Sequence, residues 1–330
     1  MSELNQQMKW LVTGCAGFIG SNILEFLLSN DQEAIGLDNF ATGFQHNLDE
    51  VRNIVGEQKW QKFKFIEGDI RDFSMCLKVT TDVDVVIHQA ALGSVPRSIN
   101  DPITSHDVNV SGFVNILKAC VDNKIKRIVY ASSSSVYGDH PDLPKQELKI
   151  GAQLSPYAVT KYANELYAQV FAKAYGIETI GLRYFNVFGS RQDPNGAYAA
   201  VIPLWFKALL NNEAPYIYGD GETSRDFCYI KNVVQMNIKA ATTTNHNAIN
   251  KVYNVACAEQ TTLNKLFFMI KDLIDPKSLV KPIYRDFRGG DIRHSLADIS
   301  LASALVGYAP QYTIQEGLKE ASGWYKKFFN

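Results

Sequence analysis

The chain has 330 residues, 46% of them hydrophobic and 20% charged, which is the balance of a globular protein with one large α/β domain or two domains that share an interface. With a formal net charge of −1, the protein has no strong positive electrostatic field that would attract nucleic acid or an anionic membrane. Any anion must therefore be bound at a local site. No apolar run reaches the roughly 18 residues of a membrane span, and Met1 to Lys9 lacks the order of a signal peptide, so we expect a cytoplasmic protein with no nucleic-acid or membrane partner.

The first half of the chain alternates short apolar runs with amphipathic stretches. The apolar runs predict strands at residues 10–13, 34–37, 63–66, 83–88, 127–131 and 179–182. The amphipathic stretches predict helices at residues 18–28, 46–55, 103–121 and 157–175. Strands separated by helices of this length imply right-handed crossovers, and hence a doubly wound parallel sheet of the Rossmann type.

The pattern changes after Arg183, where loops rich in aromatic residues, Gly, Pro, Asn and Asp begin. Shorter helices are predicted at residues 201–210, 263–274 and 314–329. We expect a smaller C-terminal α/β lobe to lie against the carboxyl ends of the strands, which is where ligands bind in doubly wound folds.

A glycine pattern lies between the first predicted strand and the first predicted helix. Gly14, Gly17 and Gly20 form G-x-x-G-x-x-G, which suits a tight turn, close approach of backbone to a pyrophosphate, and close packing of helix on strand. Asp38 ends the second predicted strand, 18 residues past Gly20, and a carboxylate there accepts hydrogen bonds from a ribose diol and repels a 2′-phosphate. The sequence therefore predicts an NAD site and favours NAD over NADP.

A second pattern concerns proton transfer. Tyr157 and Lys161 form Y-x-x-x-K at the start of a predicted helix, so both side chains lie on one face. A lysine ammonium beside the phenol, with a positive nicotinamide nearby, is expected to lower the tyrosine pKa toward neutrality and make Tyr157 a general base. The motif alone has little specificity, but it becomes specific beside the glycine pattern and the serines 132–135, which follow the fifth predicted strand.

Together these motifs resemble the extended short-chain dehydrogenase/reductase family, from about Lys9 to the C-terminus. Within that family the chain is most similar to UDP-hexose 4-epimerases, and closest to the bacterial UDP-N-acetylglucosamine/UDP-N-acetylgalactosamine 4-epimerases that supply surface polysaccharide. The similarity is carried by HQAALGSVPRS, SSSSVYGDHPDLP, SPYAVTKYANE, GLRYFNVFG and GDGETSRDF. The resemblance implies that tightly held NAD oxidises the sugar at C4, that the keto-sugar rotates, and that hydride returns to its opposite face.

The resemblance also implies roles for individual residues. Ser133 is expected to hydrogen-bond the 4-hydroxyl and relay its proton to Tyr157, and Lys161 to hold the nicotinamide ribose. The expected cofactor-binding residues are Gly14, Gly17, Phe18, Ile19, Gly20, Asp38, Asn39, Asp69, Ile70, Gln89, Ala90, Ala91, Asn109, Tyr157, Lys161 and Tyr184. The expected substrate-binding residues are Ser94, Ser133, Ser134, Asn186, Ala200, Val201, Tyr216, Tyr218, Arg225, Arg288, Asp291 and Ser295.

Three expectations concern the organisation of the protein. Residues 1–183 are predicted to form the NAD-binding Rossmann domain and residues 184–330 mainly the UDP-sugar lobe, with some chain returning to the sheet. The predicted helices at 103–121 and 157–175 are expected to form a four-helix interface in a homodimer, as in relatives. We expect no metal site, because the five cysteines are scattered and His88 has no second histidine or acid at ligand spacing.

The resemblance makes substrate breadth depend on Ser295. Family members restricted to UDP-glucose and UDP-galactose often have a large tyrosine at this position, which borders the C2 substituent of the sugar. A serine leaves room for an acetamido group, and overpacking by the larger substituent costs more than an unfilled contact. We therefore predict a preference for UDP-N-acetylglucosamine and UDP-N-acetylgalactosamine.

Other activities on the same scaffold fit less well. A UDP-glucose/UDP-galactose 4-epimerase is the nearest alternative. In 4,6-dehydratases an acidic pair stands where Ser134 and Ser135 stand here, and decarboxylases usually carry a glutamate in place of Ser135. A non-catalytic NAD-sensing regulator typically lacks the Tyr157–Lys161 pair.

Overall fold

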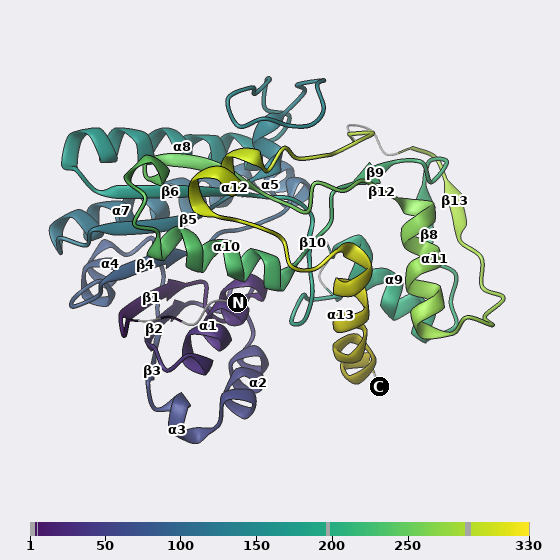
Figure 1. Cartoon of the computed structure of the whole chain (residues 1–330), viewed down its shortest axis with the longest axis horizontal. Coiled ribbons are helices and arrows are strands. Elements are labelled where there is room, and N and C mark those ends of the chain that lie inside the picture. Colours follow the sequence, from purple (N-terminus) through teal and green to yellow (C-terminus); the bar gives the residue numbers. More distant parts are fainter. Residues whose placement is uncertain (1–3, 5, 196–198, 288–291, 330) are drawn as a thin grey trace.

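The computed structural model describes residues 4, 6–195, 199–287 and 292–329, and a seven-stranded parallel sheet forms its centre (Figure 1). The strand order is β11-β6-β5-β4-β1-β2-β3, and every neighbouring pair is parallel. The strands are β1 (Lys9–Thr13), β2 (Glu33–Asp38), β3 (Phe63–Glu67), β4 (Val85–His88), β5 (Arg127–Ser133), β6 (Glu178–Tyr184) and β11 (Lys251–Val255). The predicted doubly wound α/β fold is confirmed.

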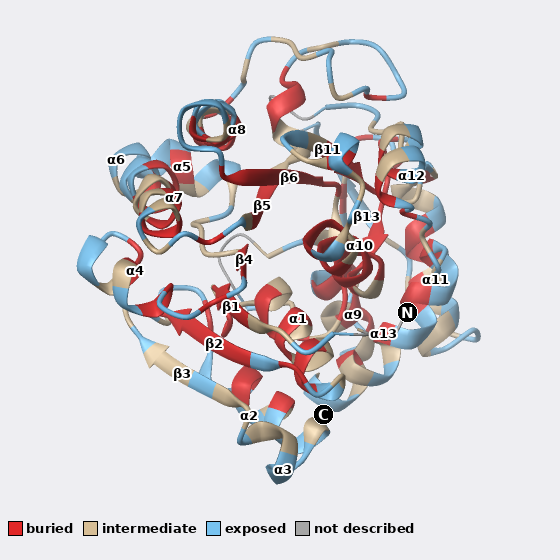
Figure 2. Ribbon diagram, turned by 60° about the vertical axis from the view of Figure 1, so that its left-hand side comes forward, coloured by how far each residue is buried: buried red, intermediate tan, exposed pale blue. Residues whose placement is uncertain are grey.

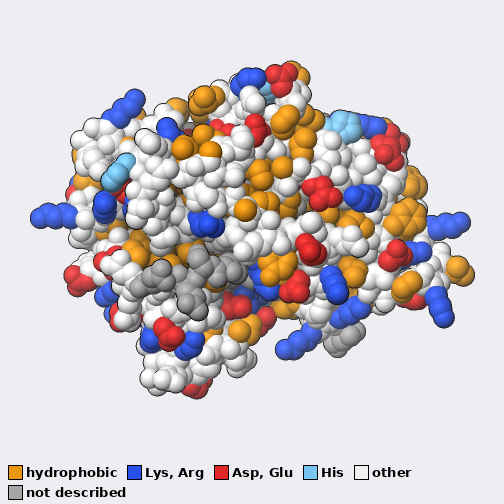
Figure 3. All heavy atoms as spheres, in the orientation of Figure 1, with side chains coloured by type: hydrophobic (Ala, Val, Ile, Leu, Met, Phe, Trp, Pro, Cys, Tyr) orange, Lys and Arg blue, Asp and Glu red, His pale blue; other side chains and the backbone are white. Residues whose placement is uncertain are grey.

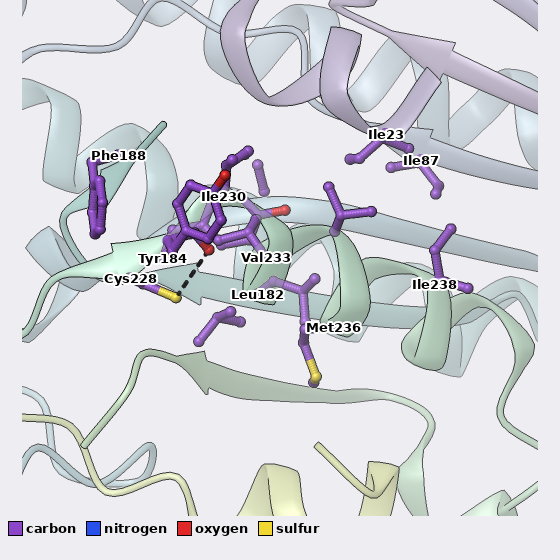
Figure 4. Close-up of a cluster of buried hydrophobic side chains, with 14 of the residues drawn as sticks. Ile23, Ile87, Leu182, Tyr184, Phe188, Cys228, Ile230, Val233, Met236 and Ile238 are labelled. Atoms are coloured by element: carbon purple, nitrogen blue, oxygen red, sulfur yellow. Dashed lines mark hydrogen bonds between the residues drawn. The ribbon is translucent and has the colours of Figure 1, made fainter. Parts of the chain in front are cut away.

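Helices cover both faces of this sheet (Figure 2). Because side chains alternate along a strand, Val12 of β1 packs in one cluster with Ile23 and Val233, while Leu11 packs in another with Phe113. Figure 4 shows part of the first cluster. The helices around the sheet are α1 (Phe18–Ser29), α2 (Gln45–Val55), α3 (Glu57–Trp60), α4 (Phe73–Val79), α5 (Val95–Asn100), α6 (Pro102–His106), α7 (Gly112–Asp122), α8 (Pro156–Tyr175) and α10 (Ile230–Thr242).

Local sequence accounts for the ends of the longest helix, α8. Ser155 caps its N-terminus by accepting a hydrogen bond from the Ala158 N–H, and Pro156 occupies the first turn, where no intrahelical N–H is needed. Gly176 ends the helix in the left-handed conformation with φ 74°. These signals place Tyr157 in the first turn.

The structure differs from the sequence prediction at several elements. The single helix expected at 103–121 is α6, a π-helical turn at Asp107–Ser111, and α7. Strand β5 extends to Ser133, so the serine run begins inside the strand and does not wholly follow it. Helix α10 was not predicted from the sequence, and in the structure it is buried on nearly every side.

The second half of the chain continues the same hydrophobic core. Trp205, Phe267 and Tyr325 belong to one cluster with Trp10 and Val12 of the sheet. The division into domains at residue 183 stays a prediction. The remaining elements are α9 (Val201–Leu210), α11 (Leu263–Ile274), α12 (Ser300–Val306), α13 (Ile314–Phe329), β7 (Val187–Phe188), β8 (Tyr216–Tyr218), β9 (Ser224–Arg225), β10 (Cys228–Tyr229), β12 (Thr261–Thr262) and β13 (Ile283–Arg285).

Positive and negative side chains are interspersed over the face seen in Figure 3, as the net charge of −1 suggests. Among the described residues no helix is both long enough and apolar enough to cross a lipid bilayer.

Candidate active site

A cavity of about 530 Å³ lies at the carboxyl ends of β1, β2, β4 and β5. Its lining brings together all the predicted cofactor-binding residues except Asn109, and also Ser94. The predicted residues in the lining are Gly14, Gly17, Phe18, Ile19, Gly20, Asp38, Asn39, Asp69, Ile70, Gln89, Ala90, Ala91, Ser94, Tyr157, Lys161 and Tyr184.

The glycines of the first turn fit a pyrophosphate. Gly14 has φ +72°, and a Cβ there would lie 2.8 Å from the Ala90 nitrogen. A Cβ on Gly20 would lie 2.0 Å from the Gly14 carbonyl oxygen. Helix α1 begins after Gly17 with no side-chain cap, which leaves its first N–H groups for an anion.

Two carboxylates line the cavity at the positions predicted to contact the ribose and the adenine. Asp38 accepts hydrogen bonds from the Ala16 N–H at 2.9 Å and the Phe40 N–H at 2.8 Å, while burial raises its pKa. Asp69 accepts from Arg71 at 2.7 Å and from the Asn39 amide at 2.9 Å, and these partners lower its pKa to about 2. The main chain therefore holds Asp38 at the end of β2, in a position that fits a ribose diol.

Asn109 is the predicted cofactor residue that lies outside the cavity lining. It is buried in the π-helical turn, and its Oδ1 accepts from the Leu92 N–H at 2.7 Å. Its Nδ2 donates to the Leu92 carbonyl at 3.0 Å and to the Thr160 hydroxyl at 3.1 Å. Asn109 thus ties the loop after β4 to helix α8, and a direct contact with the cofactor stays a prediction.

Tyr157 and Lys161 line the same cavity from one face of α8. The Lys161 ammonium donates to the Ala131 carbonyl at 2.9 Å and lies 5.9 Å from the centroid of the Tyr157 ring. Burial lowers the pKa of Lys161 to about 8. Burial raises the pKa of Tyr157, and a hydrogen bond with Ser133 lowers it. In the chain alone desolvation outweighs the hydrogen bond, and the expectation of a lowered tyrosine pKa, which includes a nearby nicotinamide, stays a prediction.

The serines 132–135 have different partners. The Ser132 hydroxyl donates to Glu165 at 2.5 Å, and Glu165 forms a buried ion pair with Arg183 at 2.7 Å. The Ser133 hydroxyl accepts from the Ser135 N–H at 3.1 Å and is the one that hydrogen-bonds Tyr157. Ser132 thus bonds Glu165 although it also lines the first cavity, and Ser133 is the serine that bonds the phenol. Neither Ser133 nor Ser134 belongs to the lining of the described cavities.

A polar cluster on the floor of the cavity includes a residue that sequence reasoning missed. The Tyr184 hydroxyl lies 3.0 Å from the Gln89 amide nitrogen and 2.9 Å from the Asn237 amide nitrogen. Asn237 is fully buried on α10. No motif marks Asn237 in the sequence, because only the fold brings α10 beneath β4 and β6.

A second cavity of about 480 Å³ contains most of the predicted nucleotide pocket. Ala199 lines both cavities, so they adjoin. Ala200 caps the N-terminus of α9 beside it, while Trp205 and Phe227 add apolar wall that the sequence did not predict. The predicted residues in its lining are Asn186, Val201, Tyr216, Tyr218 and Arg225.

The last three predicted substrate residues are Arg288, Asp291 and Ser295. Arg288 and Asp291 lie outside the described residues. Ser295 is half-buried and lines neither cavity, but its N–H donates to the Ser224 carbonyl at 3.1 Å, next to Arg225. Its main chain therefore lies beside β9, whose Arg225 lines the second cavity, and the role of its side chain stays a prediction.

Within the described part of the chain, no group of three His, Cys, Asp or Glu side chains could hold a metal ion. His88 packs between strands, with Nδ1 2.8 Å from the Thr13 hydroxyl, and burial lowers its pKa to about 3. Its imidazole is therefore neutral near pH 7.

Known proteins resemble this chain over nearly its whole length. The model of the NAD dependent epimerase/dehydratase family matches residues 10–256. A solved UDP-N-acetylglucosamine 4-epimerase from Methanobrevibacter ruminantium, in complex with UDP-N-acetylmuramic acid, is 39% identical, with a TM-score of 0.90 over 98% of this chain and 99% of that one. A UDP-glucuronic acid 4-epimerase from Bacillus cereus, in complex with UDP-glucuronic acid and NAD, is 32% identical, with a TM-score of 0.85 over 97% and 100% of the two chains.

The UDP-glucose 4-epimerase of Mycolicibacterium smegmatis is 32% identical over 97% of this chain and 99% of that protein. These likenesses agree with the glycine cradle, the carboxylate at the end of β2, and the Tyr157–Lys161 pair. As the resemblance predicted, the chain belongs to the NAD dependent epimerase/dehydratase family, and its cofactor is NAD.

Proposed function

We propose that the protein is a UDP-N-acetylhexosamine 4-epimerase that interconverts UDP-N-acetylglucosamine and UDP-N-acetylgalactosamine. One observation carries the proposal: Tyr157, hydrogen-bonded to Ser133, lines the first cavity, which adjoins a second cavity with Arg225 in its wall. An Arg guanidinium suits the oxygens of a diphosphate.

Bound NAD supplies a hydride acceptor at the sugar C4 and a positive charge beside the phenol. In the proposed reaction Tyr157 takes the proton of the 4-hydroxyl, through Ser133, and later returns it. Lys161 holds the nicotinamide ribose with its ammonium and favours the phenolate. The sugar turns between the two transfers, because the same groups then act on its other face.

Two observations support the acetylated substrate. The Methanobrevibacter ruminantium epimerase, named for UDP-N-acetylglucosamine, is 39% identical to this chain. Ser295, which is predicted to border the C2 substituent of the sugar, is small. Its main chain is hydrogen-bonded to β9, the strand that carries Arg225. Supply of precursors for surface polysaccharide in the cytoplasm is the biological setting that we propose for this activity.

A second candidate is 4-epimerisation of non-acetylated UDP-sugars. Relatives that are 32% to 39% identical are named as UDP-glucose and UDP-glucuronic acid 4-epimerases. A pocket that accommodates an acetamido group also admits a hydroxyl, so we expect the protein to turn over UDP-galactose as well. This turnover should be slower than that of the acetylated sugars, because the smaller group leaves contacts unfilled.

The Ser295→Tyr variant tests the substrate preference. A tyrosine at this position should abolish turnover of UDP-N-acetylglucosamine and spare UDP-galactose, because only the acetamido group needs the space. Ser295→Ala is the matched control and should keep both activities. Equal loss on both sugars, or no loss on either, would remove Ser295 from this role.

A further inference from the structure

Asp226 is a fully buried acidic residue next to the second cavity. Its Oδ1 accepts a hydrogen bond from the Cys257 N–H at 2.9 Å, and its Oδ2 accepts from the Ala297 N–H at 3.1 Å. The main-chain N–H groups of Ala258 and Glu259 also act on this carboxylate. Burying a carboxylate is costly unless donors satisfy it, and here main-chain donors from two separate segments do so.

One of these segments carries Ser295. Ala297 lies two residues beyond Ser295, whose N–H donates to the Ser224 carbonyl at 3.1 Å. On its other side the Lys145 N–H donates to the Leu296 carbonyl at 2.7 Å. The bond from Ala297 to Asp226 therefore closes a set of main-chain contacts that fixes residues 295–297 against strand β9.

The main chain of Asp226 also contacts the substrate cavity. Its carbonyl accepts from the Asn186 side-chain amide at 3.3 Å, and the Cys228 N–H donates to the Asn186 carbonyl at 3.3 Å. Asn186 has φ +32°, an uncommon conformation for a residue other than glycine, and it lines the second cavity beside Arg225. Contacts around Asp226 hold Asn186 in this conformation.

We infer that Asp226 is a positioning residue for the UDP-sugar, whose carboxylate joins the strand that carries Arg225 to the segment that carries Ser295. It touches neither cavity itself and acts through the residues that it holds. This inference rests on the proposed function, in which Arg225 binds the diphosphate and Ser295 borders the sugar. Asp226 is the residue that links Arg225 to Ser295.

The charge of Asp226 changes in mildly acid solution, because burial raises its pKa to about 6. Protonation turns one acceptor oxygen into a hydroxyl, which weakens one main-chain bond. A raised carboxyl pKa means that protonation favours the folded state, so acid does not unfold the protein through this group. The titratable or charged residues on the segments packed around Asp226 are Lys145, Arg225, Cys228, Cys257, Glu259, His294, Asp298 and Tyr308.

Burial raises the pKa of both Cys228 and Tyr308, so these two stay protonated through this range. His294 needs a control, because its Nδ1 lies 2.9 Å from the hydroxyl of Ser224, the neighbour of Arg225 on β9.

The first experiment measures binding of UDP-glucose to the NAD-loaded enzyme by calorimetry at pH 7.5. UDP-glucose carries no terminal phosphate, so its charge is constant between pH 5 and 8. Asp226→Asn places an amide N–H₂ against a main-chain donor and should raise Kd about 10- to 100-fold, the range for loss of a hydrogen bond to a charged acceptor. Bound NAD should be unchanged. Asp220→Asn, an exposed carboxylate of the same lobe, should stay within about twofold.

An unchanged Kd in folded Asp226→Asn would overturn the inference. If that variant does not fold, the wild-type protein gives the answer: UDP-glucose should bind at least about fivefold more weakly at pH 5 than at pH 7.5, in the wild type and in His294→Asn alike. No pH effect, or an effect lost in His294→Asn, would contradict it. A wild-type protein that binds UDP-glucose but does not epimerise UDP-N-acetylglucosamine would refute the proposed function and leave this test intact.

Discussion

The Tyr157 phenol is the residue on which proton transfer depends. The Tyr157→Phe variant should fold and keep NAD, because the hydroxyl makes no structural bond beyond that with Ser133 among the described contacts. Loss of the base should lower kcat by about 10² to 10⁴. Ser133→Ala should cost less, since Ser134 can supply a hydroxyl nearby. Single-turnover assays with measured NAD content test both variants, and near-normal turnover of Tyr157→Phe would assign the base elsewhere.

Lys161 predicts an alkaline limit of activity. Its ammonium is buried, and its pKa of about 8 lies below the ordinary value of 10.5. Activity should fall above pH 8 as the charge is lost. Stability changes in the opposite sense: between pH 8 and 10.5 the unfolded chain binds the extra proton, so this group makes unfolding less favourable as pH rises.

Parallel profiles of kcat and of the free energy of unfolding separate these effects. The Lys161→Arg variant keeps its positive charge above pH 8, so its kcat should not fall in alkaline solution, although its kcat should be lower than that of the wild type at every pH. An alkaline fall in kcat that persists in Lys161→Arg would assign the titration to another group.

At the residue scale, sequence motifs identified Tyr157, Lys161 and the glycine turn, because each motif is local in the chain. The partners of the four serines could not be predicted. Ser132 bonds Glu165 and Ser133 bonds Tyr157, and this difference depends on the alternation along β5 and on where α8 packs.

At the element scale, the turn between β1 and α1 determines whether the cofactor binds. A Cβ on Gly20 would lie 2.0 Å from the Gly14 carbonyl oxygen, so Gly20→Ala must displace α1 from the strand. We expect the purified variant to retain less than about a tenth of the wild-type NAD.

Gly323→Ala on α13 is the matched control, because nothing lies within 4 Å of a Cβ there. It should keep full NAD and gain about 0.5–1 kcal/mol in the free energy of unfolding. The NAD released when each variant is denatured measures the outcome. A normal NAD content in Gly20→Ala would contradict the role of the glycine turn in binding the cofactor.

Elements with a clear period and end signals were predicted closely, and α9, α11 and α13 have the predicted bounds. Two kinds of element were not. The apolar pattern continues through the π-helical turn at Asp107–Ser111, so the sequence predicts one helix there instead of two. Helix α10 is buried on nearly every side. Strand β11 joins the sheet beside β6 from a distance of about 70 residues, which no local pattern reveals.

At the scale of the whole molecule, an exposed apolar stripe predicts self-association. Val159 and Val170 of α8 are 54% and 58% exposed, and Ile103 of the neighbouring α6 is 75% exposed. We propose that a second copy covers this stripe in a homodimer, as the resemblance predicted.

Replacing Val159 and Val170 with aspartate should therefore give a monomer by light scattering. Leu279→Asp, at a residue that is 93% exposed in the other half of the chain, is the control and should leave the mass unchanged. A wild-type monomer, or a dimer that survives the double substitution, would refute this interface.

The proposed epimerisation requires that one bound cofactor complete the reaction without net consumption. The most direct measurement is incubation of the purified protein with UDP-N-acetylglucosamine, with no NAD added, followed by separation of the two sugar nucleotides. We predict conversion to an equilibrium mixture with UDP-N-acetylgalactosamine, and NAD in the extract of the denatured protein. No conversion, or conversion only in proportion to added NAD, would contradict the proposed epimerase.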